Sequence, residues 1–325
     1  MTEPVPCFNA HGLHISGLLP LSAPTSVGPP DLSVTLGSYR EIPWQRPAPE
    51  VIAELIGPEG WARYSFCARE GGGVTARVYS LADFELNADR SEVVAHPATD
   101  VDKEIVAILL AGTVAAFVLM ERGACVLHAS AVELSPGHAI AFAGFSARGK
   151  TTSAALLCAS GRALVTDDVL VVDMDDGVPR CGPGGTELRL RPQQIHLADA
   201  FGDRAIRRAT ADDRIAVRPS VEPCPAPELA AVVVPNPTRR STRVRVERLD
   251  VATATSELIA APRIEGWRRP EDIRRVFDQS VDLAARVPVL RAEIPWGPPF
   301  PPRIADALST AIEAELAGAT AGSRR

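Results

Sequence analysis

Apolar residues follow different patterns in the first hundred residues and in the rest of the chain. Across residues 1–98, short apolar runs stand between turn signals, which is typical of a mostly β module. The strands predicted by this pattern are residues 32–36, 61–68, 74–78 and 92–95. Three consecutive glycines at 71–73 predict a hairpin turn, and a helix is expected over residues 49–56, ended by Pro58.

Residues 102–122 form the most apolar stretch of the chain, and their centre, residues 105–120, contains no charged side chain. This centre is shorter than the roughly 18–20 apolar residues that a bilayer-spanning helix needs, and charges flank both of its ends. Asp100 or Asp102 can cap its start, and Gly123 can end it. The stretch therefore predicts a buried helix, packed behind the sheet of the domain that follows.

Strand and helix patterns alternate over the rest of the chain, so residues 99–325 are expected to form an α/β domain. Residues 126–134 and 139–143 predict the two arms of a β-hairpin, because the turn signal 135–138 lies between them. Further strands are expected at residues 162–165, 169–173, 229–234, 243–249 and 287–294, and helices at 152–160, 251–261, 270–286 and 304–317.

Three further segments of this second domain carry local signals. Residues 204–218 are dense in charge, which favours either a mobile loop facing a substrate or a solvated charged face. Pro235 and Pro237 are expected to close the strand before them. Small and polar residues at 318–325 predict a frayed tail.

Composition and charge narrow the class of protein. With 325 residues, of which 46% are hydrophobic and 23% charged, the chain can bury a large core and form two domains. A formal charge of −6 argues against a nucleic-acid binder, which normally carries a basic patch. The six cysteines include no C-x-x-C pair, and the N-terminus lacks a basic segment followed by an apolar run. We therefore expect a cytoplasmic protein without structural zinc, disulfides, a nucleic-acid partner or a membrane partner.

Candidate chemistry is concentrated in residues 144–151, which fit the phosphate-loop pattern G-x-x-x-x-G-K-[ST]. A predicted strand precedes this segment and a predicted helix follows it, so the helix N-terminus would face a bound anion. Lys150 would add its charge at the β- and γ-phosphates, and Thr151 would reach Mg²⁺. The residues expected to hold the nucleotide are Gly144, Phe145, Ser146, Ala147, Arg148, Gly149, Lys150, Thr151 and Thr152. A glycine turn between two core elements is the alternative interpretation.

Two adjacent carboxylates, Asp167 and Asp168, follow the predicted strand 162–165. Shortly after a phosphate loop, one carboxylate can hold the metal and the other can accept a proton from an attacking hydroxyl. His128 stands near the start of the hairpin's first arm, where it could lie beside the acidic pair. A purely structural histidine is an equally good interpretation of its spacing.

In this order and spacing, His128, the hairpin, residues 144–151 and the pair Asp167-Asp168 resemble the catalytic domain of the HPr kinase/phosphorylase family. The resemblance is closest over residues 127–172. It implies the phosphate-loop kinase fold that this family shares with phosphoenolpyruvate carboxykinases, here preceded by the mostly β module.

The resemblance implies ATP and Mg²⁺ as cofactors, with Lys150 and Thr151 on the phosphates and the metal. It also implies that a carboxylate of the acidic pair is the base facing an acceptor serine, with the histidine close by. We assign the base to Asp167 and a metal contact to Asp168 as a working hypothesis.

Residues 186–189 resemble the family's Glu-x-Arg segment, in which the glutamate helps hold the metal and the arginine lies near the phosphates. The resemblance therefore adds Glu187 to the expected metal ligands and Arg189 to the expected nucleotide site. A charged edge strand is the alternative interpretation, since residues 187–191 alternate in polarity.

The chain departs from the family pattern at several positions. Ala147 stands where the family usually has glycine, Arg148 where it has a small or apolar residue, and Thr151 where it has serine. Residues 190–192 replace the glycine-rich signature that usually follows Glu-x-Arg. These departures favour the divergent HPr-kinase-like proteins, some of which phosphorylate a serine of a lasso-peptide precursor, over an enzyme that acts on HPr and runs the reverse reaction.

The expected function is therefore a serine kinase that acts on a protein or peptide, in an assembly that could be a homo-oligomer. A kinase of a small-molecule hydroxyl and a nucleotide-binding switch without transfer remain as alternatives. A GTPase switch is disfavoured because no N-K-x-D motif follows the loop. Lys150→Ala is expected to abolish transfer with the fold intact, and Asp167→Asn to abolish transfer while sparing nucleotide binding.

Overall fold

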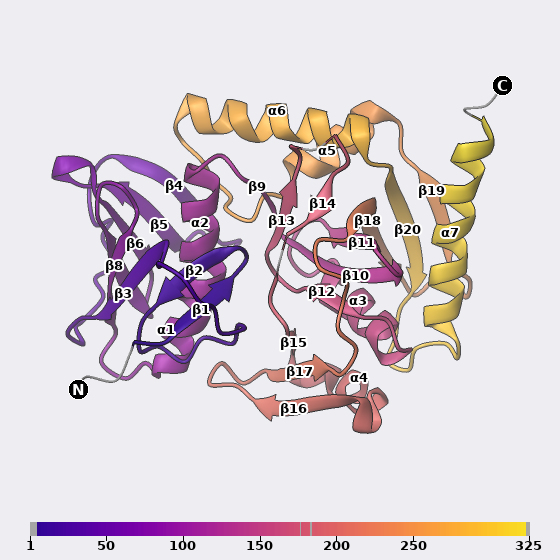
Figure 1. Ribbon diagram of the computed structural model, residues 1–325, viewed down its shortest axis with the longest axis horizontal. Helices are drawn as coiled ribbons and strands as arrows, with labels where there is room; N and C mark the ends of the chain where they lie inside the picture. The colour runs from indigo at the N-terminus through magenta and orange to yellow at the C-terminus, as the bar shows by residue number, and fades with distance from the viewer. Residues whose placement is uncertain (1–4, 176, 183, 323–325) are drawn as a thin grey trace. The chain divides into compact units, whose positions relative to one another are not determined.

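The computed structural model describes residues 5–175, 177–182 and 184–322 (Figure 1). The chain divides into two units. The first is Met1–Ala124 with Arg263–Arg275, and the second is Cys125–Pro262 with Val276–Arg325. This division lies later than the boundary expected at residue 98, because the apolar helical stretch groups with the β-rich first unit.

An eight-stranded sheet with the order β1-β2-β3-β8-β7-β6-β5-β4 forms the first unit. Its strands are Cys7–Ala10 (β1), Leu13–Ser16 (β2), Leu32–Leu36 (β3), Val51–Ile56 (β4), Ala62–Ala68 (β5), Val74–Val78 (β6), Ala82–Leu86 (β7) and Glu92–Pro97 (β8). The predictions of β3, β5, β6 and β8 are confirmed. The short 3₁₀ helix Glu70–Gly72 (η1) makes the predicted turn between β5 and β6, and Gly71 has a φ of 75° there, which glycine adopts without strain.

The helix expected over residues 49–56 is wrong, because most of these residues form the edge strand β4. This strand pairs with β5 in antiparallel fashion, and Ala53 forms a bridge to Trp267 on its other side. Glu54 is buried and accepts two hydrogen bonds from Arg46, at 2.7 and 2.6 Å. Pairing on both sides outweighs the local preference of this segment.

The apolar stretch forms one helical run. Its parts are Lys103–Leu109 (α1), the π-helical turn Leu110–Val114 (η2) and Ala115–Glu121 (α2). Asp102 caps the start by accepting a hydrogen bond from the Glu104 N–H at 2.7 Å. By length and composition alone the run could cross a membrane, but 61% of its most apolar window is buried. Phe117 stacks on Phe66 of β5 with ring centroids 4.1 Å apart. The run is thus a core helix on the sheet of the first unit, in contrast to its expected place behind the catalytic sheet.

The second unit contains a nine-stranded mixed sheet. Its strands are Cys125–Leu127 (β9), Ala129–Ser135 (β10), His138–Ala143 (β11), Leu164–Thr166 (β12), Leu170–Asp173 (β13), Arg180–Cys181 (β14), Glu228–Thr238 (β18), Arg245–Arg248 (β19) and Val289–Pro295 (β20). The predicted hairpin is confirmed, since β10 and β11 pair in antiparallel fashion. Both β11 and β20 run parallel to β18. The carboxyl ends of these three strands therefore meet at one edge, where α/β sheets bind ligands.

Helices cover both faces of this sheet, which confirms the α/β class. Those on one face are Lys150–Ala159 (α3), Ile195–Ala200 (α4) and Ile304–Gly322 (α7); those on the other are Val251–Ile259 (α5) and the C-terminal part of Pro270–Arg286 (α6). Phe142, Leu157 and Leu308 share the first core. Leu258 and Leu283 belong to the second.

For the charged segment 204–218, the solvated charged face is confirmed and the loop is wrong. The segment contains the hairpin of Ala205–Ala209 (β16) and Ile215–Pro219 (β17), which pairs with Leu188–Leu190 (β15); Arg207 and Arg208 are exposed, while Val217 is buried. Two further expectations for the second unit are corrected by the structure. Pro235 does not end β18, because pairing with β11 stops at Val233 and the proline then faces only one ladder, with β20. Helix α7 continues past residue 317 to Gly322, and residues 323–325 of the expected frayed tail lie outside the described residues.

Candidate functional site

The candidate phosphate loop joins β11 to α3. Strand β11 ends at Ala143 and the ten-residue helix α3 begins at Lys150, so the free N–H groups of a helix N-terminus face the loop. Gly144 and Gly149 have φ values of 134° and 87°, in the range that favours glycine. A Cβ on Gly149 would lie 2.3 Å from the Trp296 ring, so no larger residue fits there without movement. The predicted order of strand, glycine loop and helix is found in the fold.

Lys150 folds its amine back onto this loop. Its Nζ donates hydrogen bonds to the backbone oxygens of Gly144 and Phe145, at 2.8 and 3.0 Å, and the residue is 6% exposed. An ammonium group held on loop carbonyls is positioned to turn to phosphate oxygens entering the loop. Phe145 is 47% exposed, and the Arg148 guanidinium lies over its ring, 5.6 Å from the centroid.

Asp167 follows β12 and is the buried member of the acidic pair, at 8% exposed. Its Oδ1 accepts hydrogen bonds from the hydroxyls of Ser130 and Thr151, at 2.6 and 2.9 Å. Its Oδ2 accepts a hydrogen bond from the backbone N–H of Arg189 at 3.1 Å. Burial raises the pKa of the Asp167 carboxyl, and the Ser130 hydrogen bond acts in the opposite direction.

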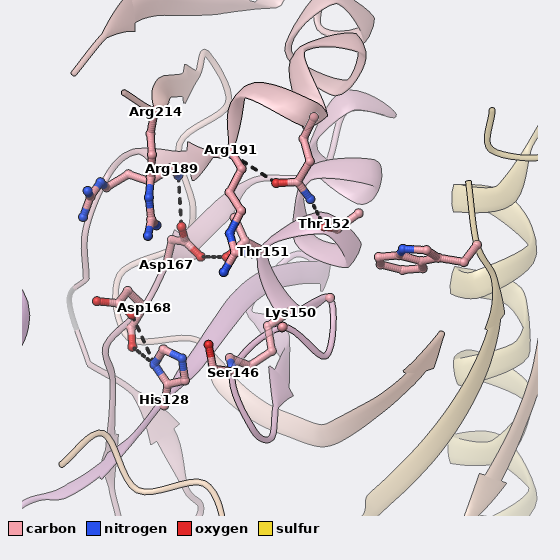
Figure 2. Close-up of a pocket in the computed structure, with 14 residues that line it drawn as sticks. His128, Ser146, Lys150, Thr151, Thr152, Asp167, Asp168, Arg189, Arg191 and Arg214 are labelled. Atoms are coloured by element: carbon pink, nitrogen blue, oxygen red, sulfur yellow. Dashed lines mark hydrogen bonds and ion pairs between the residues drawn. The ribbon is translucent and has the colours of Figure 1, made fainter. Parts of the chain in front are cut away.

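Asp168 faces His128 instead (Figure 2). Its φ of 74° marks a left-handed turn between β12 and β13, and its side chain is 38% exposed. His128 Nδ1 lies 3.1 Å from Asp168 Oδ1 and 3.3 Å from the backbone oxygen of the same residue. His128 separates β9 from β10, and its backbone N–H donates to the backbone oxygen of Ala261 at 2.8 Å. The fold therefore brings the histidine to the acidic pair, although one continuous strand is expected there from the sequence.

Three arginines, Arg189, Arg191 and Arg214, line the same pocket as Lys150 (Figure 2). The Arg189 guanidinium forms an ion pair with Asp212, and Arg214 Nε lies 3.1 Å from the same carboxylate. Burial lowers the pKa of Arg189, while Asp212 raises it. Four cationic side chains at one pocket suit a ligand with several negative charges.

The pocket has a volume of about 270 Å³. The expected site residues that line it are His128, Ser146, Ala147, Gly149, Lys150, Thr151, Thr152, Asp167, Asp168 and Arg189. Among the residues that the structure describes, the expected members that do not line it are Gly144, Phe145, Arg148 and Glu187.

Sequence reasoning missed five residues at or beside the pocket, namely Ser130, Arg191, Gln194, Arg214 and Trp296. Two of them carried a local signal. Ser130 stands two residues after His128, and Arg191 stands two residues after Arg189, so the period of a strand predicts each pair on one face. The other three come from segments with no motif of their own.

Glu187 directly precedes β15 and is held by partners outside the pocket. Its Oε2 lies 2.9 Å from Arg208 Nη2, and its Oε1 lies 3.4 Å from Arg218 Nη2. Both arginines belong to the β16–β17 hairpin. In this structure Glu187 ties the three-stranded sheet together, and it would have to leave these arginines to reach a metal.

The oxygen donors at the pocket fit a magnesium ion. Mg²⁺ prefers oxygen ligands and is usually held by one or two carboxylates together with substrate phosphates and water. The Thr151 hydroxyl and the Asp167 carboxylate, joined by their 2.9 Å hydrogen bond, supply such donors beside the loop. In the described part of the chain, no cluster of three or more His, Cys, Asp or Glu side chains is placed to hold a metal by itself.

Comparisons with known proteins leave the family open. No protein-family model and no curated protein matches the chain. Among solved structures, the chain is similar to the Hpr(Ser) kinase/phosphatase from Coxiella burnetii, with 11% identity and a TM-score of 0.30, over 61% of this chain and 94% of that chain. A likeness at this level does not establish the family or the activity.

Proposed function

We propose that the protein is an ATP-dependent kinase that transfers the γ-phosphoryl group to a serine hydroxyl of a protein or peptide. The observation that carries this proposal is the different placement of two carboxylates at one phosphate-loop pocket. Asp167 is buried against the Thr151 hydroxyl, whereas Asp168 is partly exposed beside His128. A site that only bound a nucleotide would use the first carboxylate for its metal and would have no need of the second with its histidine.

Thr151 and Asp167 form the metal side of the proposed site. A bound Mg²⁺ would neutralise charge on the β- and γ-phosphates. The Ser130 hydroxyl and the Arg189 N–H hold the Asp167 carboxylate in place for this role. Lys150 and the loop N–H groups would bind the phosphate oxygens.

Asp168 is proposed as the base, which exchanges the roles that the sequence suggests for the two aspartates. Asp167 already accepts three hydrogen bonds and is 8% exposed, whereas the side chain of Asp168 is 38% exposed, so an acceptor arriving from solvent meets Asp168 first. His128 Nδ1, 3.1 Å away, orients the Asp168 carboxylate. Geometry is the first requirement of a general base.

In the proposed reaction, the serine oxygen attacks the γ-phosphorus while the bond from this phosphorus to the bridging oxygen breaks and ADP leaves. The serine proton passes to Asp168. Because phosphoryl transfer has a loose transition state, most of the acceleration comes from positioning and charge neutralisation. Arg191 and Arg214 line the pocket and are available to stabilise the charge on the transferred group.

The proposal is tested by incubating the full chain with γ-labelled ATP and Mg²⁺, separately with a pool of serine-containing peptides and with a pool of metabolites. Label is expected in the peptides as phosphoserine. Label in the metabolites alone would make the protein a small-molecule kinase. Label in neither pool, with nucleotide bound, would make it a binding module.

We further propose a cytoplasmic location for this reaction. All six cysteines are free, in keeping with a reducing compartment. An acidic chain with a formal charge of −6 also suits a protein or peptide partner better than a nucleic acid.

A further inference from the structure

We propose that an apolar groove one helical turn from the phosphate pocket binds the purine base of the donor nucleotide, an inference that rests on the proposed function. The groove has a volume of about 490 Å³. Side chains from α3, α4 and the loop after β20 line it, among them Leu156, His196, Ala200 and Phe300. Apolar walls with aromatic side chains are typical of sites for flat organic groups.

The groove lies one turn of α3 beyond the phosphate pocket. Thr152 lines the phosphate pocket and Leu156 lines the groove. Four residues apart on α3, they share one face of the helix and lie about 6 Å apart along its axis. Helix α4 makes the same link, because Gln194 lines the phosphate pocket, donates a hydrogen bond to the Thr152 hydroxyl and stands two residues before His196. A base one ribose away from phosphates in the loop therefore has the groove within reach.

Three aromatic rings lead from the loop into this groove. The Trp296 ring packs against Gly149, and the Phe300 centroid lies 5.4 Å from it at an interplanar angle of 81°. The His196 ring follows, 5.8 Å from Phe300 and tilted by 29°. The backbone N–H of Trp296 donates to the backbone oxygen of Thr238 at 2.8 Å, which fixes this loop to the end of β18. Aromatic faces held in this way can stack on a nucleotide base.

The combined site has the polarity of a nucleoside triphosphate. At one end lie the carboxylates of Asp167 and Asp168 and the amine of Lys150. At the other end, no Asp, Glu, Lys or Arg is among the described residues that line the groove. A phosphate loop sets the orientation of the bound nucleotide, because its lysine reaches the β- and γ-phosphates while its backbone holds the α- and β-phosphates. The uncharged base then points along α3 toward the groove.

The groove offers little to distinguish one purine from another. His196 Nε2 is buried and has no hydrogen-bond partner in the part of the chain that the structure describes, so the ring must turn before this nitrogen can reach the edge of a base. The other lining side chains named above are apolar. Since stacking tolerates every base, ATP and GTP are expected to bind with affinities within about tenfold of each other.

A probe without a base separates the groove from the phosphate loop. Calorimetry on the full chain with Mg²⁺ would measure the Kd of inorganic tripolyphosphate and the Kd of ATP. The tripolyphosphate Kd divided by the ATP Kd reports the affinity that the nucleoside adds. Ala200→Trp is expected to reduce this ratio by about tenfold or more, with tripolyphosphate affinity within about twofold of wild type, and Trp296→Ala is expected to raise the Kd of ATP by about tenfold or more. Ala200 is exposed, so a tryptophan there fills the groove without removing a core contact, and Ala200→Ser is the matched control that leaves it open.

An unchanged ratio in Ala200→Trp would overturn the inference. If Trp296→Ala loses tripolyphosphate binding as well, the loop at Gly149 has been disturbed, and Ala200→Trp decides alone. If the wild type fails to bind tripolyphosphate, the proposed function fails first. Trp296 is the single tryptophan of the second unit, so quenching of its fluorescence by ATP should disappear in Trp296→Phe, and persistent quenching would contradict stacking at this ring.

Discussion

Asp167 and Asp168 are bonded neighbours with opposite environments. The first is buried and accepts hydrogen bonds from Ser130 and Thr151, and the second is 38% exposed beside His128. The left-handed φ of 74° at Asp168 gives the backbone a turn between the two side chains. The two carboxylates should therefore affect different steps of the reaction.

Substitution of each aspartate should separate transfer from binding. Asp168→Asn is expected to lower the single-turnover rate by about 10²–10⁴, the usual contribution of a general base, while the Kd of Mg²⁺-ATP stays within about threefold. Asp167→Asn is expected to raise that Kd by about tenfold or more, because a carboxylate beside the metal is lost. Quench-flow and calorimetry measure the two effects. If Asp167→Asn binds normally but does not transfer, the roles revert to those suggested by the sequence.

The buried Asp167 should also affect the pH dependence of stability. Burial raises its folded-state pKa above the unfolded value, so its contribution to stability is present below the unfolded pKa and is lost as the pH rises through the folded pKa. Asp167→Asn cannot ionise. Without nucleotide and metal, the Tm of this variant relative to wild type is therefore expected to rise as the pH increases from about 4 to about 8. Scanning calorimetry would measure it, and a Tm difference independent of pH would contradict a raised pKa.

Among the elements, the site is assembled at junctions. The loop between β11 and α3, the turn between β12 and β13, the strand β15 and the segment after β20 each supply lining residues. At such junctions the backbone takes a fixed turn and other side chains pack closely against it. Gly149 combines a φ of 87° with contact to the Trp296 ring.

Gly149→Ala tests this junction. The added Cβ would meet the Trp296 ring at 2.3 Å, so the loop must move, and the ATP Kd is expected to rise by about tenfold or more in a fluorescence titration. Gly161→Ala is the matched control at the other end of α3, because Gly161 has a φ of 106° with open space around it. That variant should lose about 1 kcal/mol of unfolding free energy from backbone strain and bind ATP normally. Equal ATP affinities in the two variants would show that the contact with Trp296 is unimportant.

Glu187→Gln tests whether this side chain serves the metal or the three-stranded sheet. Its carboxylate is held by Arg208 and Arg218. The Mg²⁺ concentration for half-maximal ATP binding is therefore expected to stay within about twofold, while proteolysis of the β16–β17 hairpin becomes faster. A tenfold higher Mg²⁺ requirement would make Glu187 a metal ligand, as the family resemblance implies.

For the whole molecule, every described residue that lines the phosphate pocket belongs to the second unit. The first unit supplies an eight-stranded sheet and its core helix. Nucleotide binding should therefore be visible as a local effect within one unit.

Hydrogen exchange with and without Mg²⁺-ATP tests whether the effect of nucleotide binding is confined to the second unit. Protection is expected at residues 144–152, 167–168 and 189–194, because these segments line the pocket. A ligand at about one hundred times its Kd adds about 2.7 kcal/mol to the stability of the unit that binds it. Amides of strands β5 and β6 should exchange at unchanged rates. Equal protection of those strands would mean that the binding site extends beyond the second unit.

Sequence patterns are sufficient to predict those elements whose structure depends on residues adjacent in the sequence. The hairpin, the glycine loop and the following helix are local, so turn residues and apolar periodicity predict them. Helix α6 was placed with its observed bounds, Pro270–Arg286. By contrast, the strand β4 and the continuation of β18 through Pro235 depend on which strands lie beside them. Pairing of distant segments leaves little trace in local composition.

The candidate site shows the same division. By itself the sequence determined the loop, the lysine, the acidic pair and a histidine at the right spacing, since each lies in a segment with its own backbone signal. Only the tertiary structure decided that Asp167 is buried beside Thr151 while Asp168 is partly exposed beside His128, and that Arg214 and Trp296 join them. Burial, charge proximity and ring contact are relations between residues far apart in sequence, and they exist only once the sheet has brought its edges and loops together.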